Sequence, residues 1–466
     1  MIISYEPLSC KREGLRSLRA DMTTGTNYSV AASGGSLTSP GVGSLWSGKR
    51  FYIASLLFLN LFINYIDRIN LSVAGPAIAK HFSWDPGRMG VIFSSFQWTY
   101  CFFLLLWGWM ADRMSTRFIN SVSVTIWSIG AMLTGIATGF AGMLATRLVL
   151  GAGEAASFPT SGKVVRQWFP PGERGLATAI FNAGTFAGPA FSAPLVAWLL
   201  MRVGWRASFV LTGSLGFLWV LLWLKVFRVP AECSWLPEEE RNYILSQTDV
   251  QHRASPPPKG TLLRLLSRAT MWSLFLTQGC CAYTMLLFLF WLPSYLVQSR
   301  HMSIVKAGWF TSVPYIAAVL VGLLVGKLSD SLLSDESIKQ GKRRTLLIVF
   351  IVLSVSVLLT NMIANQWMLL LIVSISLACI SSALSLNIAL TSDLVWNPEM
   401  VGVATGFLIL GGNIFGSLVP IVTGYIVKWT GSFDLAFYLA AFLLAVAALV
   451  SFSLTRRPLA FNTEGS

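Results

Sequence analysis

Long apolar segments recur along most of the chain, each separated from the next by a short polar or charged stretch. From Phe51 onward, windows of about twenty apolar residues follow one another, and each is long enough to cross a hydrocarbon core of about 30 Å as an α-helix. The pattern predicts twelve spans, at 51–76, 89–111, 118–139, 142–165, 175–201, 207–228, 270–297, 305–328, 345–364, 367–391, 401–428 and 433–455. We therefore expect an all-α membrane protein with twelve transmembrane helices.

The polar stretches between and around these spans predict five parts. Residues 1–49 are rich in Ser, Gly and Thr, which is typical of a disordered tail. Residues 229–268 carry charges of both signs and Pro256-Pro257-Pro258, which predicts a cytoplasmic linker with a surface helix. We expect an N-terminal six-helix bundle at 50–228, a C-terminal six-helix bundle at 269–457 and a short cytoplasmic tail at 458–466.

Short motifs repeat at matching places in the two predicted bundles. The second span ends in Gly108-Trp-Met-Ala-Asp112, and the eighth ends in Gly326-Lys-Leu-Ser-Asp330. Glycines four residues apart occur in the fifth span, at 184 and 188, and in the eleventh, at 412 and 416. A single pair of this kind indicates only ordinary close helix packing. Matched pairs predict two pseudosymmetric bundles that can rock against each other, as alternating access requires.

The composition agrees with a membrane protein and gives the chain an orientation. With 54% hydrophobic and 12% charged residues, the chain is too apolar for a soluble protein of its length. The net charge of +14 does not indicate nucleic-acid binding, because no basic run is interleaved with exposed aromatic residues. Basic residues instead follow the even-numbered spans, as at Arg113, Arg117 and Arg174. By the positive-inside rule, both termini are expected in the cytoplasm.

Neither a metal site nor an enzyme active site is predicted. The six cysteines have no metal-ligand spacing, and the three histidines fall in predicted loops far apart. No nucleophile, base and orienting group can be assembled outside the spans. We expect a protein that is not an enzyme, has no cofactor and is a monomer in the lipid bilayer.

Charged residues inside the first and fourth spans are the strongest functional signal. Asp67 and Arg68 interrupt an apolar run, where an ionised side chain costs roughly 2.5 to 3.5 kcal/mol unless it faces a protein interior or a watery cavity. Arg147 and Glu154 are seven residues apart, so they lie on one helix face about 10 Å apart. Their depths predict that Asp67 meets Arg147 and that Glu154, near the middle, is less well paired.

These four residues suggest separate sites for proton coupling and for substrate binding. A less well paired Glu154 is the better proton-coupling site, with Asp67 titrating when Arg147 is drawn away. Arg68 is then free to bind a substrate carboxylate through its forked donors. The alternatives are that the Asp67–Arg147 pair only holds two helices together, and that Arg68 reaches out to the membrane interface.

Polar residues in other spans are candidates for binding substrate hydroxyl groups. Each of them could equally form a hydrogen bond between helices. They are Tyr65, Gln97, Tyr100, Asn182, Thr185, Tyr315, Asn387 and Asn413.

From Phe51 to Arg457 the chain resembles the Major Facilitator Superfamily. The loop signature of that superfamily is matched at Gly108 to Arg117, with Met110, Ser115 and Thr116 as departures. The resemblance implies the Major Facilitator fold and a role in conformational change for the residues of this signature. The acid at the cytoplasmic end of the tenth span resembles that of hexuronate carriers, and we favour a gate or a helix-end charge there over a substrate contact. With the echo of the signature in the second half, these positions form the candidate gating set. These are Gly108, Asp112, Arg113, Arg117, Asp330 and Asp393.

Three further motifs resemble the anion:cation symporter family. They are Tyr65-Ile-Asp-Arg-x-Asn-Leu-Ser-Val-Ala74, Arg147-x6-Glu154-Ala-x2-Phe-Pro159 and Phe290-Trp-Leu-Pro-x-Tyr-Leu296. Members carry galactonate, hexuronates, glucarate, tartrate, phthalate and other organic anions, generally with protons. The resemblance implies proton sites at Asp67 and Glu154, a partner at Arg147, and substrate contacts from Tyr65, Arg68 and Tyr100. Thr185 stands where galactonate-type carriers have glutamine.

The function expected from the sequence is proton-coupled import of a small organic anion across the inner (plasma) membrane. Sugar acids such as hexuronates, hexonates and aldarates fit the resemblance, as do other carboxylates. A sodium-coupled or exchanging carrier of organic anions or phosphate is the first alternative. A membrane sensor that binds without transporting is the second. We expect no nucleic-acid partner under any of these three functions.

Overall fold

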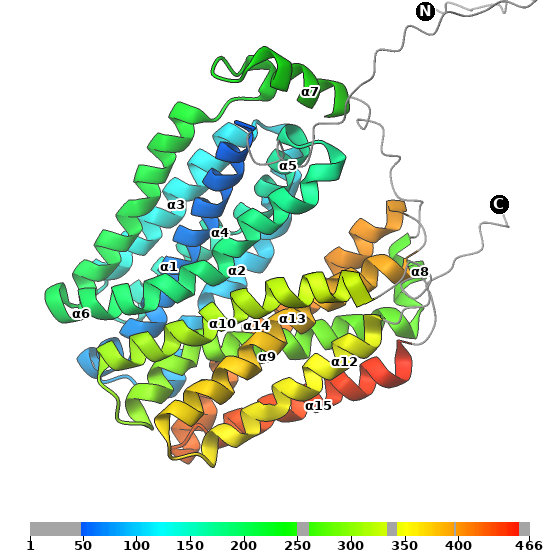
Figure 1. Cartoon of the computed structure of the whole chain (residues 1–466). Helices are drawn as coiled ribbons and strands as arrows, with labels where there is room; N and C mark the ends of the chain where they lie inside the picture. The colour runs from blue at the N-terminus through cyan, green and yellow to red at the C-terminus, as the bar shows by residue number, and fades with distance from the viewer. Residues whose placement is uncertain (1–47, 249–260, 333–342, 396–397, 456–466) are drawn as a thin grey trace, which may run out of the picture. The chain divides into compact units, whose positions relative to one another are not determined.

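The computed structural model describes residues 48–248, 261–332, 343–395 and 398–455. They belong to one compact unit that begins at Gly48 and is helical almost throughout (Figure 1). The predicted tails therefore lie almost entirely outside the described residues. The elements are α1 (Phe51–Phe82), α2 (Pro86–Arg113), α3 (Thr116–Ile136), α4 (Phe140–Glu154), α5 (Ser157–Trp168), η2 (Pro171–Glu173), α6 (Arg174–Val226), η3 (Pro230–Glu232), α7 (Glu238–Thr248), α8 (Thr261–Leu266), α9 (Ala269–Gln298), α10 (Ile304–Leu332), α12 (Arg343–Ser354), η5 (Val355–Asn361), α13 (Gln366–Leu394), α14 (Pro398–Thr430) and α15 (Asp434–Leu454).

The helices account for the twelve predicted spans. Among the described residues, ten helical segments are long and apolar enough to cross a membrane. One of them holds both the fifth and the sixth predicted spans, because α6 breaks at Gly204, whose φ of 79° is not helical. The fourth predicted span is divided into α4 and α5 by Ala155 and Ala156, so neither part is long enough alone.

Local sequence signals explain where several helices begin and end. The Asp85 carboxylate accepts a hydrogen bond from the Arg88 backbone N–H at 2.8 Å, and Pro86 starts α2 with its fixed φ. Ser83 ends α1 in the left-handed conformation. Asn365 caps α13 by accepting from two backbone N–H groups. These short-range signals separate neighbouring helices and let them fold back on each other.

The two halves of the chain pack in corresponding ways. In the first half, α1 packs on α6 and α2 on α4; in the second, α9 packs on α14 and α10 on α13. The repeated glycines lie at equivalent crossings, since Gly188 faces Tyr65 on α1 and Gly416 faces Leu286 on α9. The expected pseudosymmetry is therefore visible in the packing, whereas the domain boundaries at 228 and 269 stay a prediction.

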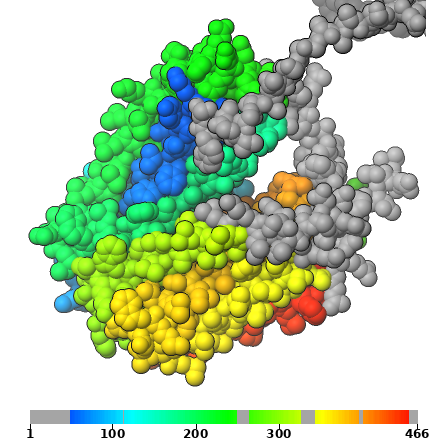
Figure 2. Space-filling model, viewed as in Figure 1, coloured from blue at the N-terminus to red at the C-terminus, as the bar shows by residue number. Residues whose placement is uncertain are grey.

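The halves meet through three helix crossings at one end of the bundles. They pair α1 with α9, α2 with α14, and α6 with α10, and Figure 2 shows atoms of α6 lying against those of α10. Hydrogen bonds reinforce all three: Ser72 donates to the Phe290 carbonyl at 2.9 Å, Gln97 donates to Asn413 at 2.8 Å, and Ser312 donates to the Ala190 carbonyl. Ser72, Phe290 and Ser312 lie in the helix halves remote from Gly48, and Asn413 lies at the middle of α14.

At the opposite end, the linker helix α7 is fastened to the first half. Arg50 donates to Glu173 at 2.7 Å and to Glu240 of α7 at 2.7 Å. Trp168 and Trp235 stack with ring centroids 5.6 Å apart beside this cluster. The predicted surface helix in the linker is thus present, while residues 249–260 of the linker lie outside the described residues.

Large apolar side chains cover much of the outer surface of the helices. Leu105, Leu221 and Phe442 are 78%, 66% and 62% exposed. In water such a surface would be costly at about 25 cal/mol per Å². A hydrocarbon environment removes that cost, which agrees with the predicted membrane spans.

Candidate functional site

The break between α4 and α5 places a carboxylate inside the first half of the chain. Glu154 is the last residue of α4 and its side chain is fully buried. The residue before it is glycine, and a Cβ there would stand 2.6 Å from the Trp127 backbone nitrogen. Only glycine permits so close an approach of α4 to α3, which brings the end of α4 deep into the bundle.

Glu154 forms a direct ion pair with Arg68 of α1. The Arg68 Nε lies 2.8 Å from the Glu154 Oε2. The guanidinium also lies over three aromatic rings, with centroid distances of 4.7 Å to Tyr65, 4.6 Å to Phe96 and 5.2 Å to Tyr100. The rings fix the plane of the guanidinium, so its forked donors point in a defined direction.

Asp67 and Arg147 lie beside this pair and are not bonded to each other. Arg147 donates to the Thr134 hydroxyl at 2.6 Å and lies over the Phe209 ring at 5.6 Å. Asp67 is 1% exposed, and its carboxylate interacts electrostatically with both Glu154 and Arg147. Neither Asp67 oxygen makes a hydrogen bond of normal geometry to a described residue.

The pairing expected from helix depth is therefore wrong. We predicted that Asp67 meets Arg147 and that Glu154 is less well paired, whereas Glu154 holds the direct ion pair and Arg68 is its partner. Depth along a helix does not give direction, because successive residues project about 100° apart. Arg68 turns toward Glu154, and Asp67 faces away toward α4 and α6.

The second half of the chain reaches this cluster through tyrosine and amide side chains. Tyr315 of α10 is fully buried and interacts electrostatically with Tyr65. Gln97 and Asn413 join α2 to α14 close to the level of Phe96 and Tyr100. The structure thus assembles Tyr65, Arg68, Tyr100 and Tyr315 around one buried ion pair.

The other predicted binding residues are engaged within and between helices. Asn387 donates to the Leu274 carbonyl and to Gln278, each at 3.0 Å. Thr185 donates to the backbone carbonyl of Asn182 at 2.8 Å. These are the helix contacts that we weighed as the alternative, and a substrate role for these residues stays a prediction.

Sequence reasoning missed three residues at the cluster. Phe96 lies under the Arg68 guanidinium, Thr134 accepts from Arg147, and Thr212 lies next to Asp67. The spacing of Phe96 and Tyr100 was a usable signal, since residues four apart share a helix face. The threonines gave none, because hydroxyls are common in transmembrane helices.

The predicted gating residues lie toward the end of the bundles that carries α7. Arg113 donates to the Trp109 carbonyl at 3.2 Å, and Arg117 donates to the Leu224 carbonyl. Asp393 pairs with Arg343 at 2.9 Å. A Cβ on Gly108 would meet open space. The side chains of Asp112 and Asp330 lie outside the description, so the gating role of this set stays a prediction.

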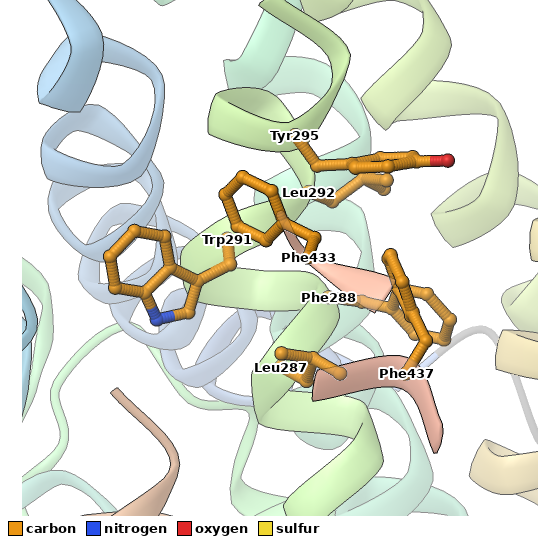
Figure 3. Close-up of a pocket in the computed structure, with 7 residues that line it drawn as sticks. All are labelled: Leu287, Phe288, Trp291, Leu292, Tyr295, Phe433 and Phe437. Atoms are coloured by element: carbon orange, nitrogen blue, oxygen red, sulfur yellow. The ribbon is translucent and has the colours of Figure 1, made fainter. Parts of the chain in front are cut away.

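A cavity between α9 and α15 is not suited to an anion. Its lining is aromatic and aliphatic (Figure 3): Leu287, Phe288, Trp291, Leu292, Tyr295, Phe433 and Phe437. The one hydroxyl among them, on Tyr295, accepts a hydrogen bond from Arg300 at 2.8 Å. Nor does the described part of the chain gather three metal-ligating side chains anywhere. The charged cluster on α1 and α4 is therefore the candidate site.

Known proteins with similar sequences and structures are transporters. The sequence profile of the Major Facilitator Superfamily matches residues 57–340 and 307–465. A probable galactarate/D-glucarate transporter of Bacillus subtilis (strain 168) is 34% identical over 88% of this chain and 92% of its own length. A protein of Escherichia coli (strain K12) with the same description is 33% identical over 83% of this chain and 89% of its own length.

A solved structure supports the fold. A bacterial homologue of the human lysosomal transporter Spinster, in an inward-facing and occupied conformation, superposes with a TM-score of 0.69. The match covers 87% of this chain and 97% of that one at 18% identity.

Proposed function

Because this chain belongs to the Major Facilitator Superfamily and is a multi-pass membrane transporter related to sugar-acid carriers, we propose that it imports a sugar acid by proton symport. The aldarates galactarate and D-glucarate are the first substrates to test, since both of the relatives described above are probable transporters of these two dianions. Galactonate, hexuronates and other carboxylates come next.

The buried Arg68–Glu154 ion pair carries the proposal. The Arg68 Nε donates to Glu154 at 2.8 Å, and the Glu154 carboxylate balances the charge of the guanidinium, so Arg68 cannot pair fully with a substrate carboxylate while this ion pair is intact. Protonation of Glu154 removes its charge and releases the guanidinium, which then binds the carboxylate of the substrate. One proton and one carboxylate therefore enter the site together, and neither a bare anion nor an unpaired buried arginine is produced.

Arg147 can bind the second carboxylate of an aldarate, and Asp67 can take up a second proton, although these two side chains form no direct ion pair. Both side chains are buried, and Asp67 lies within the electrostatic reach of Arg147. A dianion with two protons carries no net charge. Each uncompensated negative charge would instead meet about 2.3 kcal/mol of opposition per 100 mV in a negatively charged interior.

We place both termini in the cytoplasm, on the basic residues that follow the even-numbered spans. With that orientation the joined ends of α1, α2, α6, α9, α10 and α14 face outward. The conformation described here is then inward-facing. The substrate path opens toward the side that carries α7.

Uptake into proteoliposomes tests the function. We expect galactarate or D-glucarate to accumulate when the outside is made acidic, and the accumulation to collapse with a protonophore but not when sodium is replaced. Collapse on sodium removal would favour the sodium-coupled carrier. Binding without accumulation would favour the sensor.

The Glu154→Gln variant tests the coupling. Glutamine resembles the protonated acid and leaves Arg68 available, so exchange of internal for external substrate should persist. Proton-driven accumulation should be lost, because no proton is carried. Accumulation at the wild-type level in this variant would show that Glu154 does not couple transport to protons.

A further inference from the structure

Two buried asparagines on α1, on the same helix face as Asp67, have no role in the mechanism above. Asn60, Asn64 and Asp67 are spaced at i, i+4 and i+7, so they share one helix face. The two asparagines are 2% and 0% exposed. Neither the nitrogen nor the oxygen of either amide makes a hydrogen bond of normal geometry to a described residue.

Other helices of the first half present similar atoms. The Ser128 hydroxyl and the Trp127 indole N–H of α3 and the Ser157 hydroxyl of α5 are buried and make no such hydrogen bond to the described residues. The Oε1 atom of Glu154 is also buried without such a hydrogen bond. The Glu154 carboxylate interacts with the nearby Asn64 amide.

Close helix packing brings these elements to one level of the bundle. A Cβ on the glycine before Glu154 would collide with the backbone at Trp127. A Cβ on Gly216 of α6 would collide with Ser128. Gly184 of α6 approaches the Phe58 carbonyl of α1 in the same way. The unpartnered atoms therefore belong to the interior of one bundle and not to the junction between the halves.

Such atoms require a partner that is not a side chain. A buried polar group without a hydrogen bond keeps the full cost of its lost hydration, so a bundle with several of them would be strongly destabilised. Water satisfies such groups where two to four polar atoms converge. The Asn64 amide interacts with the Glu154 carboxylate, and Trp127 lies against the residue before Glu154, so several of these polar groups are near one another.

We propose that Asn60 and Asn64 hold a line of water molecules inside the N-terminal bundle, and that this line carries the proton from Glu154 toward the α7 end. The inference rests on the proposed proton coupling and adds its route. Asn60 lies about 10 Å from Asp67 along α1, in the direction of Gly48. The substrate moves between the halves, so the proton and the anion leave by separate paths.

The proton balance of the step is simple. Protonated Glu154 gives its proton to the adjacent water, and its carboxylate re-forms the ion pair with Arg68. The excess proton passes along the hydrogen-bonded water, and the amides stay neutral throughout. Beyond Asn60 the side chains of Ile53 and Leu57 are apolar and fully buried. We therefore assign the next step of the route to the buried polar pair of Thr160 on α5 and Asn120 on α3, which are hydrogen-bonded at 2.5 Å.

Leucine variants separate this route from the rest of transport. Asn60→Leu and Asn64→Leu keep the branched shape and the number of heavy atoms of the side chain and remove the polar atoms. In proteoliposomes with galactarate, we expect exchange to persist, because exchange needs no proton release. Acid-driven accumulation and the linked change of an internal pH dye should fall to the level seen with a protonophore. Asn64→Ser should restore both, since a hydroxyl also holds water.

A control variant removes a buried polar group elsewhere. Thr277 of α9 is hydrogen-bonded to Ser451 at 2.7 Å in the C-terminal half. Thr277→Val should leave accumulation unchanged. If it abolishes accumulation as the leucine variants do, their effect is a general one of burial and the proposed route is rejected.

The outcomes distinguish this inference from the proposed function. If the wild type does not accumulate galactarate with protons, both are wrong. If the wild type does and both leucine variants match it, only the water route is wrong. A high-resolution density map of the wild type serves where a variant fails to fold: bridging waters at Asn60 and Asn64 are expected, and a dry interior at these amides would overturn the proposal.

Discussion

At the scale of single residues, the adjacent side chains of Asp67 and Arg68 on α1 lie in different environments. Arg68 points to Glu154 and its three aromatic rings, while Asp67 lies toward Thr212 and Arg147. A guanidinium in such a setting is stabilised by its charge partner and by the ring faces together. In the function that we propose, protonating the Glu154 carboxylate opens this ion pair.

A double-mutant cycle should detect this coupling. Arg68→Gln and Glu154→Gln each leave one buried charge without its partner, which costs about 3–5 kcal/mol in comparable buried pairs. The double variant leaves neither charge, so we expect its apparent unfolding temperature in detergent to exceed that of Arg68→Gln. Strictly additive losses in the double variant would show that the two side chains do not interact in solution.

At the scale of elements, backbone contact between helices closes one end of the molecule. A Cβ on Gly424 of α14 would stand 2.5 Å from the Pro86 carbonyl oxygen of α2. Gly406, on the same helix, has no atom within 4 Å of its Cβ position. A side chain at the first position must push α2 and α14 apart, whereas one at the second is free.

Substitution of Gly424 should therefore affect transport, whereas substitution of Gly406 should not. We expect Gly424→Leu to open the joined ends and to reduce transport, because the halves can no longer close there. A cysteine at Ser294, which lines a small cavity at this junction, should react faster with a membrane-impermeant thiol reagent in a chain without its native cysteines. Gly406→Leu is the matched control. Equal reactivity in the two variants would contradict the crossing described here.

At the scale of the whole molecule, an ion pair between the halves lies at the joined end. Lys428 of α14 lies 3.1 Å from the Asp85 carboxylate at the start of α2. The hydrogen bond from the Arg88 backbone N–H, with help from Lys428, holds the pKa of the Asp85 carboxyl below its usual range. A lowered pKa in the folded state means that the ionised form of Asp85 stabilises the folded protein.

The pH dependence follows from the direction of that shift. The stabilisation is complete above the unfolded pKa of about 3.9 and is lost as the pH falls through the lower folded pKa. Because the two side chains are 36% and 40% exposed, the effect is below about 1 kcal/mol. Apparent unfolding temperatures measured from about pH 6 down to pH 3 should fall further for the wild type than for Asp85→Asn. Parallel curves would exclude this contribution.

The outcome at particular residues shows how far the sequence could lead. The spans and the matched glycines at 188 and 416 followed from apolar runs and repetition, and the linker helix followed from local composition. All of these are local properties of the sequence. The partner of Glu154 did not. Choosing between Arg68 and Arg147 requires the rotation of α1 about its axis, and that rotation is fixed by contacts with α6 that no local pattern records.

The sequence by itself determined that this protein is a bundle of membrane helices in two related halves, with acids and arginines buried in the first. An apolar run of about twenty residues has one stable form in a bilayer, and a charge inside it must face the protein. The tertiary structure alone decided which charges meet, which polar atoms lack partners and which ends of the helices join. These depend on side-chain direction and helix crossing, which are set by residues distant in the chain.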